Sequence, residues 1–120
     1  MSDERREYVR VREKLVTLVK HTATGKVHRA LTRDIGGVGI CIITSEPLES
    51  GARLELELKL PESDRTIPFT GIVAWSQVMG GPRKSYEDPM REIGIKFVDI
   101  APKDLAFIKQ HAAMNAVPPG

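Results

Sequence analysis

Two short stretches of this chain combine side chains and backbone suited to an anionic, hydrogen-bonding ligand. The first lies near the N-terminus, where positions 5, 6 and 10 are arginines. A guanidinium group is planar and permanently charged, so it can bond in pairs to a phosphate or to the acceptor edge of guanine, and it can stack on a base. Arg5, Arg6 and Arg10 are therefore candidate ligand-binding residues.

The second stretch is Asp34-Ile35-Gly36-Gly37-Val38-Gly39. Glycines at positions 36, 37 and 39, after an aspartate, predict a turn at which the main chain approaches a ligand closely and donates N–H groups. Each stretch also has an ordinary interpretation, which is a solvated arm of paired charges for the arginines and a plain turn or β-bulge for the glycines. Their occurrence together, in this order, favours a site for a nucleotide rich in phosphate and guanine.

The composition is that of one globular domain. The chain has 120 residues, which is enough for one hydrophobic core and too few for two ordinary domains. Its hydrophobic fraction of 41% and charged fraction of 28% are typical of a folded protein rather than a disordered one. The net charge of +2 is small for a general binder of duplex DNA, so an anion site should be local.

Cysteine usage and hydropathy indicate a cytoplasmic protein without membrane insertion. Cys41 is the single cysteine, which excludes an internal disulfide and fits a reducing compartment. No apolar run approaches the roughly 18–20 residues of a membrane helix. The charged first residues are not followed by the hydrophobic region of a signal peptide.

Apolar and polar residues alternate with a period of two along most of the chain, which predicts strands with one buried face. In residues 54–60 every even position is leucine and every odd position is charged. Five other segments have strand chemistry, at 15–20, 27–32, 38–43, 67–75 and 92–97. Six strands with short connections predict a sandwich or a small barrel. From Pro102 to about Ala113 the apolar spacing becomes helical, so one terminal helix should pack on the barrel.

These motifs resemble the PilZ domain, the receptor module for the bacterial second messenger cyclic di-GMP. Its pattern is Arg-x-x-x-Arg, usually after another arginine, followed by Asp/Asn-x-Ser-x-x-Gly. Residues 5–10 and 34–39 follow this pattern except at Gly36, where serine is usual. The segment 71–75 looks like the Gly-x-Val-x-Trp strand of many members, and 92–97 resembles the later Gly-hydrophobic-x-Phe strand. The resemblance covers roughly residues 4–113.

The resemblance implies an all-β fold, a six-stranded antiparallel β-barrel of the split-barrel type with a C-terminal α-helix. It divides the chain into a flexible arm with the arginine motif (residues 1–14), the barrel with its helix (15–114) and a disordered tail (115–120). The implied ligand is cyclic di-GMP, without any cofactor or metal. The downstream partner would be a protein effector that the sequence does not identify.

The resemblance also implies roles for individual residues. Arg5, Arg6 and Arg10 match the arginines that contact ligand phosphates and guanine edges, and Asp34 matches the acceptor for guanine N–H groups. Gly39 would permit the tight turn. Glycine in place of serine at 36 removes one neutral hydrogen bond, worth up to about tenfold in affinity. We therefore expect weakened rather than abolished binding.

Trp75 has two interpretations. A lone tryptophan in a β domain is usually part of the core, whereas the resemblance places it at a strand end that borders the ligand face. We include Trp75 among the candidate ligand-binding residues.

No pattern in the chain predicts catalysis. His21, His28 and His111 have no recognised metal-ligand spacing and are expected to face solvent. Cys41 lies in an apolar segment, which favours a buried small hydrophobic residue over a nucleophile. We expect neither an enzyme nor a metal protein.

Two other classes of function compete with the receptor. A ligand-independent PilZ-fold adaptor would fit the glycine at 36, although Arg6, Arg10, Asp34 and Gly39 are all retained. A small barrel for single-stranded DNA or RNA would need an array of stacking aromatics. The chain has six aromatic residues, and three phenylalanines among them look like core, so we expect no nucleic-acid partner.

Overall fold

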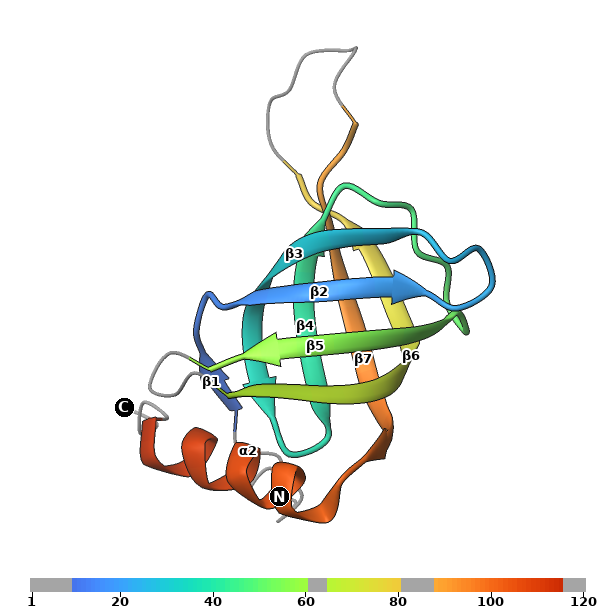
Figure 1. Cartoon of the computed structure of the whole chain (residues 1–120). Coiled ribbons are helices and arrows are strands. Elements are labelled where there is room, and N and C mark those ends of the chain that lie inside the picture. The colour runs from blue at the N-terminus through green and yellow to red at the C-terminus, as the bar shows by residue number, and fades with distance from the viewer. Residues whose placement is uncertain (1–9, 61–64, 81–87, 116–120) are drawn as a thin grey trace.

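The structure is a closed antiparallel β-barrel with one extra strand and one helix (Figure 1). This computed structural model describes residues 10–60, 65–80 and 88–115. The elements are β1 (Arg10–Arg12), β2 (Val16–His21), β3 (Val27–Gly36), β4 (Gly39–Thr44), β5 (Arg53–Lys59), β6 (Thr66–Val78), β7 (Arg91–Ile100) and α2 (Pro102–Asn115).

Six strands form the barrel in the order β3-β2-β5-β6-β7-β4, and the pairing of β4 with β3 closes it. All of these pairings are antiparallel. The seventh strand, β1, lies alongside the last residues of β3, where Arg10 is opposite Gly36. The predicted six-stranded antiparallel barrel with a C-terminal helix is therefore confirmed, and closure leaves few strand edges open.

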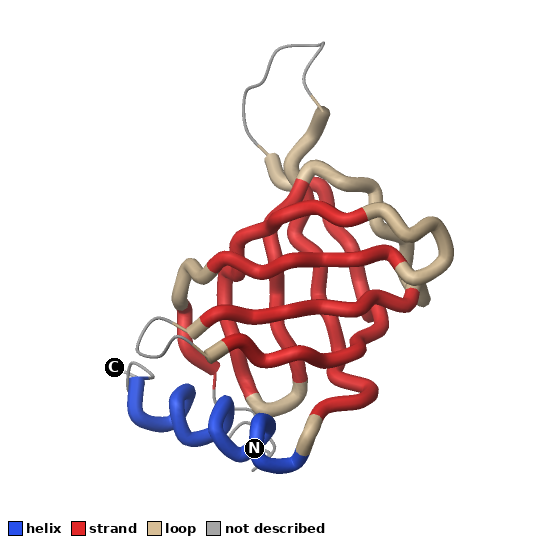
Figure 2. Tube along the Cα trace, in the orientation of Figure 1, coloured by secondary structure: helices blue, strands red, loops and turns tan. Residues whose placement is uncertain are grey.

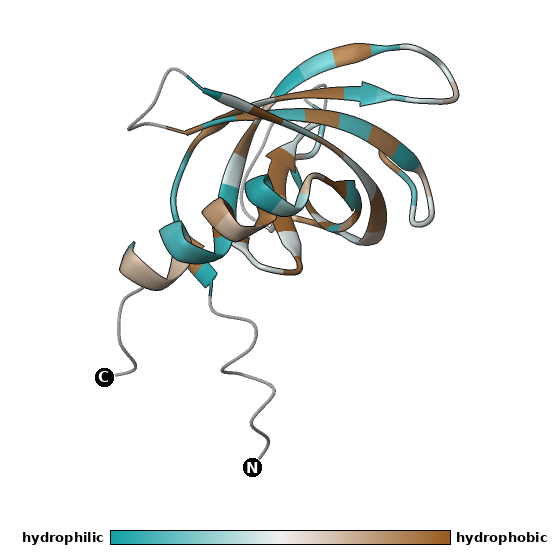
Figure 3. Cartoon of the chain, turned by 60° about the horizontal axis from the view of Figure 1, so that its bottom comes forward, coloured by the Kyte–Doolittle hydropathy of each residue, from teal (hydrophilic) through white to brown (hydrophobic). Residues whose placement is uncertain are grey.

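Each predicted strand is present, with different ends. The leucines of β5 are at most 2% exposed, and its charged residues face solvent, as the alternation predicts. Figure 3 shows a similar change between hydrophobic and hydrophilic residues along part of the barrel, whereas residues 39–42 of β4 are all buried. β3 continues to Gly36 and β6 continues to Val78, beyond the predicted limits. The short strand β1 was missed, because its three residues contain two arginines and show no apolar period.

The helix α2 lies across one end of the barrel (Figures 2 and 3). Ile108 and Ala112 are fully buried in the barrel core, which confirms the predicted apolar face. An ion pair between Arg65 and the buried Asp104 holds the first turn of the helix. His111 is buried rather than solvent-facing, and its Nε2 lies 2.6 Å from Oε1 of Glu13. In the part of the chain that the structure describes, α2 is the only helix, and it is not suited to span a membrane.

Thr32 fastens the bend between β1 and β2 to β3. Its hydroxyl accepts a hydrogen bond from the N–H of Leu15 at 2.8 Å and donates one to the carbonyl of Glu13 at 2.5 Å. Thr32 is fully buried, so water cannot replace either bond. The same contacts keep β1, and with it Arg10, alongside the end of β3.

Replacing Thr32 with valine keeps the side-chain shape and leaves the Leu15 N–H without its acceptor. We expect Thr32→Val to lower the free energy of unfolding by about 1–3 kcal/mol, measured by urea denaturation. Thr17→Val is the matched control, since Thr17 is equally buried but its hydroxyl only donates, to Glu57 at 3.0 Å. Equal losses in the two variants would contradict this account.

Candidate functional site

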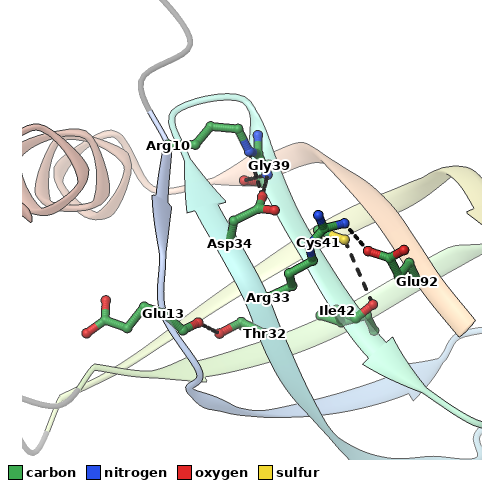
Figure 4. Close-up of polar contacts among 9 residues, drawn as sticks. All are labelled: Arg10, Glu13, Thr32, Arg33, Asp34, Gly39, Cys41, Ile42 and Glu92. Atoms are coloured by element: carbon green, nitrogen blue, oxygen red, sulfur yellow. Dashed lines mark hydrogen bonds and ion pairs between the residues drawn. The ribbon is translucent and has the colours of Figure 1, made fainter. Parts of the chain in front are cut away.

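A β-bulge in β3 turns two consecutive charged side chains outward. Thr32 and Asp34 lie opposite successive residues of β4, so Arg33 is the extra residue. Thr32 and Ile35 are both 0% exposed in the core, although a regular strand would place them on opposite faces. The bulge absorbs this difference and leaves Arg33 and Asp34 together on the outer face (Figure 4).

A second bulge, in β6, has the same effect on Trp75. Val73 and Trp75 lie opposite successive residues of β7, and Ala74 is the extra residue. Val73 is 1% exposed, whereas Trp75 is 44% exposed. Trp75 is therefore a surface residue rather than part of the core.

Two glycines between these bulges allow neighbouring groups to pack closely against the backbone. A Cβ on Gly39 would lie 1.9 Å from the carbonyl oxygen of Ile95, so β4 and β7 approach closely there. A Cβ on Gly94 would lie 2.1 Å from Nε1 of Trp75, so the indole ring lies directly over this glycine. Gly39 has no positive φ, and close packing rather than a turn conformation requires a glycine at this position.

A cavity of about 390 Å³ lies on the outer face of the barrel between the two bulges. β1, β3, β4, β6 and β7 contribute its walls, and Val38 lies in the turn before β4. Its lining residues are Arg10, Arg33, Asp34, Val38, Gly39, Ile40, Cys41, Ala74, Trp75, Gly94, Ile95 and Lys96. Three of these are basic and one is acidic, so the lining carries a net positive charge of two. Such a cavity is suited to an anion of similar size that also has flat apolar parts.

Ion pairs organise the charged wall (Figure 4). Nε of Arg10 donates a hydrogen bond to Oδ1 of Asp34 at 2.6 Å, and its Nη2 also contacts this carboxylate. Nη2 of Arg10 is also 3.4 Å from the carbonyl oxygen of Gly39. Arg33 forms an ion pair with Glu92 of β7, which crosses over β4. A guanidinium fixed by a carboxylate loses little freedom when a ligand binds to its remaining N–H groups.

Cys41 lies beneath these ion pairs and is 3% exposed, in agreement with the predicted buried residue. Burial raises the pKa of the Cys41 thiol, and the carboxylates of Asp34 and Glu92 raise it further. Arg33 and Arg10 act in the opposite direction with smaller effect. The group is a neutral thiol at neutral pH, which makes it a poor nucleophile.

The structure brings together four of the eight predicted site residues, since Arg10, Asp34, Gly39 and Trp75 all line the cavity. Gly36 ends β3, and Gly37 lies in the β3–β4 turn next to Lys109 of α2; neither lines the cavity. The predicted residues Arg5 and Arg6 lie outside the described residues.

Sequence reasoning missed two basic residues of the cavity, Arg33 and Lys96. For Arg33 the signal depends on knowing that the polar Thr32 is buried, which the structure shows and the sequence alone does not. The buried Thr32 and Ile35 are three positions apart, which does not fit a strand period of two and indicates a bulge between them. For Lys96 the sequence offers no comparable signal, because an outward lysine is ordinary on a strand. Across the described ranges, no group of three or more His, Cys, Asp and Glu side chains could hold a metal ion.

Comparison with known proteins gives a family and a fold. A family model described as the PilZ domain matches residues 4–113. The structure is similar to the PilZ domain of YcgR from Escherichia coli with c-di-GMP, with a TM-score of 0.72 and 15% identity over 92% of this chain and 91% of that one. No curated protein matches the sequence.

Two longer proteins are also similar. For the inhibitor of motility (MotI/DgrA) of Bacillus subtilis, the TM-score is 0.73 at 23% identity, over 92% of this chain and 50% of that one. For the MrkH–c-di-GMP complex of K. pneumonia, the TM-score is 0.70 at 20% identity, over 92% of this chain and 51% of that one. The chain thus spans about half the length of these two proteins, and identities this low show the fold alone.

The two cavity glycines should respond differently to an added methyl group. In Gly39→Ala the new Cβ meets backbone atoms of β7, so we expect a loss of about 3 kcal/mol in the free energy of unfolding. In Gly94→Ala it meets the Trp75 side chain, which can turn away, so we expect a loss of about 1 kcal/mol. Urea denaturation measures both losses, and a changed tryptophan emission should mark Gly94→Ala. A larger loss for Gly94→Ala would refute the close approach at Gly39.

Proposed function

The chain belongs to the PilZ domain family, whose model matches residues 4–113, and on this basis we propose that it is a receptor for cyclic di-GMP. The structures of YcgR and MrkH, two proteins of the same fold, are complexes with c-di-GMP. The ligand has two guanine bases and two phosphodiester groups, so the site must accept both flat aromatic and anionic parts.

The observation that carries this proposal is the Arg10–Asp34 pair in the same cavity as Trp75. The Asp34 carboxylate can accept hydrogen bonds from guanine N1–H and N2–H, and a guanidinium can donate to guanine acceptors. The half-exposed Trp75 indole offers a surface on which a base can stack. The lining residues carry a net positive charge of two, which Glu92 reduces beside Arg33, so the cavity favours an anionic ligand.

Ligand binding need not break the Arg10–Asp34 contact. A guanidinium has five N–H donors and a carboxylate has about four lone-pair sites, so both groups keep capacity for a ligand while bonded to each other. The pair therefore holds a donor and an acceptor at fixed positions before the ligand arrives. Such preorganisation reduces the entropy lost on binding.

Arg5 and Arg6 complete the proposed site as phosphate-binding residues. They precede Arg10, which begins β1 at the edge of the cavity. Four residues of extended chain span at most about 14 Å, so Arg6 is tethered within reach of a ligand in the cavity. We propose that the ligand orders this arm and that the ordered form docks on a partner protein, as a population shift between two states.

Gly36 supports one competing function, a PilZ-fold adaptor that works without ligand. Where the family pattern usually has serine, glycine can offer no hydroxyl, which lowers affinity by up to about tenfold. The cavity charges and the Arg10–Asp34 pair favour the receptor, because a ligand-independent adaptor has no need of either.

Calorimetric titration of cyclic di-GMP, with GTP as the control ligand, tests the receptor function. We expect saturable binding to the wild type at micromolar to sub-millimolar ligand. Arg10→Ala should weaken it by roughly tenfold to a hundredfold, since charged hydrogen bonds are lost. Arg53→Ala is the matched control, because Arg53 is an exposed arginine of β5 that does not line the cavity. A folded wild type that binds no cyclic di-GMP would favour the adaptor.

Trp75 provides a second test, as the single tryptophan of the chain. Cyclic di-GMP should change its fluorescence, and Trp75→Leu should weaken binding by on the order of tenfold through lost stacking. Trp75→Phe retains a flat ring and should stay within about threefold of the wild type. If Trp75→Leu binds as tightly as the wild type in the same calorimetric titration, Trp75 is not part of the ligand site.

A further inference from the structure

We propose that Arg33 is a further ligand-binding residue of the cavity, contacting a phosphodiester group, and that Glu92 positions it. This deepens the function proposed above and rests on it. Arg33 lines the cavity, and its side chain is 39% exposed. The bulge in β3 directs it to the outer face, next to Asp34.

The guanidinium of Arg33 retains donors for a ligand. Its Nη1 donates to Oε2 of Glu92, and its other N–H groups have no hydrogen-bond partner among the described residues. A planar group with several unused N–H donors at a cavity wall can bind two phosphate oxygens at once. This geometry is suited to a ligand contact.

The other two cations of the cavity are less suited to a phosphodiester group. Arg10 is bonded through two of its nitrogens to Asp34, whose negative charge also repels a nearby phosphate. Lys96 carries a compact charge on a flexible stem, without a planar fork. The carboxylate that neutralises Arg33 belongs to Glu92, which does not line the cavity. A phosphate can therefore approach Arg33 from the cavity while Glu92 holds the guanidinium from the other side.

Glu92 is thus a positioning residue. Its side chain is 18% exposed and comes from β7, so the ion pair reaches Arg33 across β4 and above Cys41 (Figure 4). A free arginine side chain loses considerable rotamer entropy when a ligand fixes it, and a carboxylate that fixes it in advance lowers that loss. Removing Glu92 should consequently weaken ligand binding without removing any ligand contact.

A purely structural ion pair is the alternative, in which Arg33 and Glu92 only tie β3 to β7. It makes a different prediction. Loss of either partner would then lower the melting temperature and leave the affinity of the folded protein unchanged. Affinity and melting temperature must therefore be measured on the same variants.

The test is calorimetric titration of cyclic di-GMP into the full chain carrying Arg33→Gln or Arg33→Lys. Arg33→Gln should weaken binding by roughly tenfold to a hundredfold, and Arg33→Lys by about tenfold, because lysine keeps the charge but loses the fork. The matched control is Arg29→Gln, which removes the same charge from an exposed position of the same strand, outside this cavity. It should stay within about twofold of the wild type.

Two further readouts separate positioning from structure. Glu92→Ala should weaken binding several-fold, and Glu92→Gln, which keeps an acceptor oxygen, should restore most of the affinity. The salt dependence of binding should fall in Arg33→Gln and not in Arg29→Gln, as expected when a phosphate contact is lost.

The outcomes are distinguishable. Wild-type affinity in a folded Arg33→Gln, with binding lost in Arg10→Ala, would overturn the role of Arg33 and leave the receptor function standing. No binding by the wild type would overturn the receptor function itself. If circular dichroism shows that Arg33→Gln does not fold, Arg33→Lys decides, and wild-type affinity there together with an unchanged Glu92→Ala overturns the proposal.

Discussion

The alternation of side chains along the strands of a closed barrel is the constraint on which this structure depends. Every strand must direct alternate residues into one shared core, and a shift by one residue would exchange core and surface. The candidate site lies where this rule is interrupted. The bulges at Arg33 and Ala74 each add one residue, so that Asp34 and Trp75 face outward while Ile35 and Val73 remain buried. The cavity between the two bulges is therefore a product of strand register as much as of residue type.

The two arginines of the cavity are each paired with a carboxylate. The Arg10–Asp34 pair reaches β4 at Gly39, and the Arg33–Glu92 pair crosses β4 to β7. Without these carboxylates, neighbouring guanidinium groups would repel one another. With them, the barrel surface holds donors and acceptors in place at little electrostatic cost. The small net charge of the whole chain is consistent with a site that is local rather than a broad basic surface.

Much of the fold could be predicted from the sequence. The leucine alternation at 54–60 specifies a strand with one buried face, and the helical spacing after Pro102 specifies a helix with one buried face. The motif residues Arg10 and Asp34 could likewise be recognised, since their chemistry is visible in their types and spacing. The contribution of Arg33 could not, because an arginine beside a known motif has no distinguishing chemistry until the bulge sets its direction. The reason for glycine at 39 was also hidden, since it depends on Ile95, which is distant in sequence. The direction of Arg33 and the need for glycine at 39 both depend on pairing between strands that are distant in sequence. Local sequence patterns carry no information about that pairing.

The bulge at Arg33 also has an evolutionary consequence. If the extra residue were deleted, Thr32 and Ile35 would still face inward, because regular alternation over the shortened strand gives the same core. The cavity and the core can thus change independently under natural selection. A lineage can lose one charged group of the cavity through a single deletion and still inherit an intact scaffold, on which other uses can then arise.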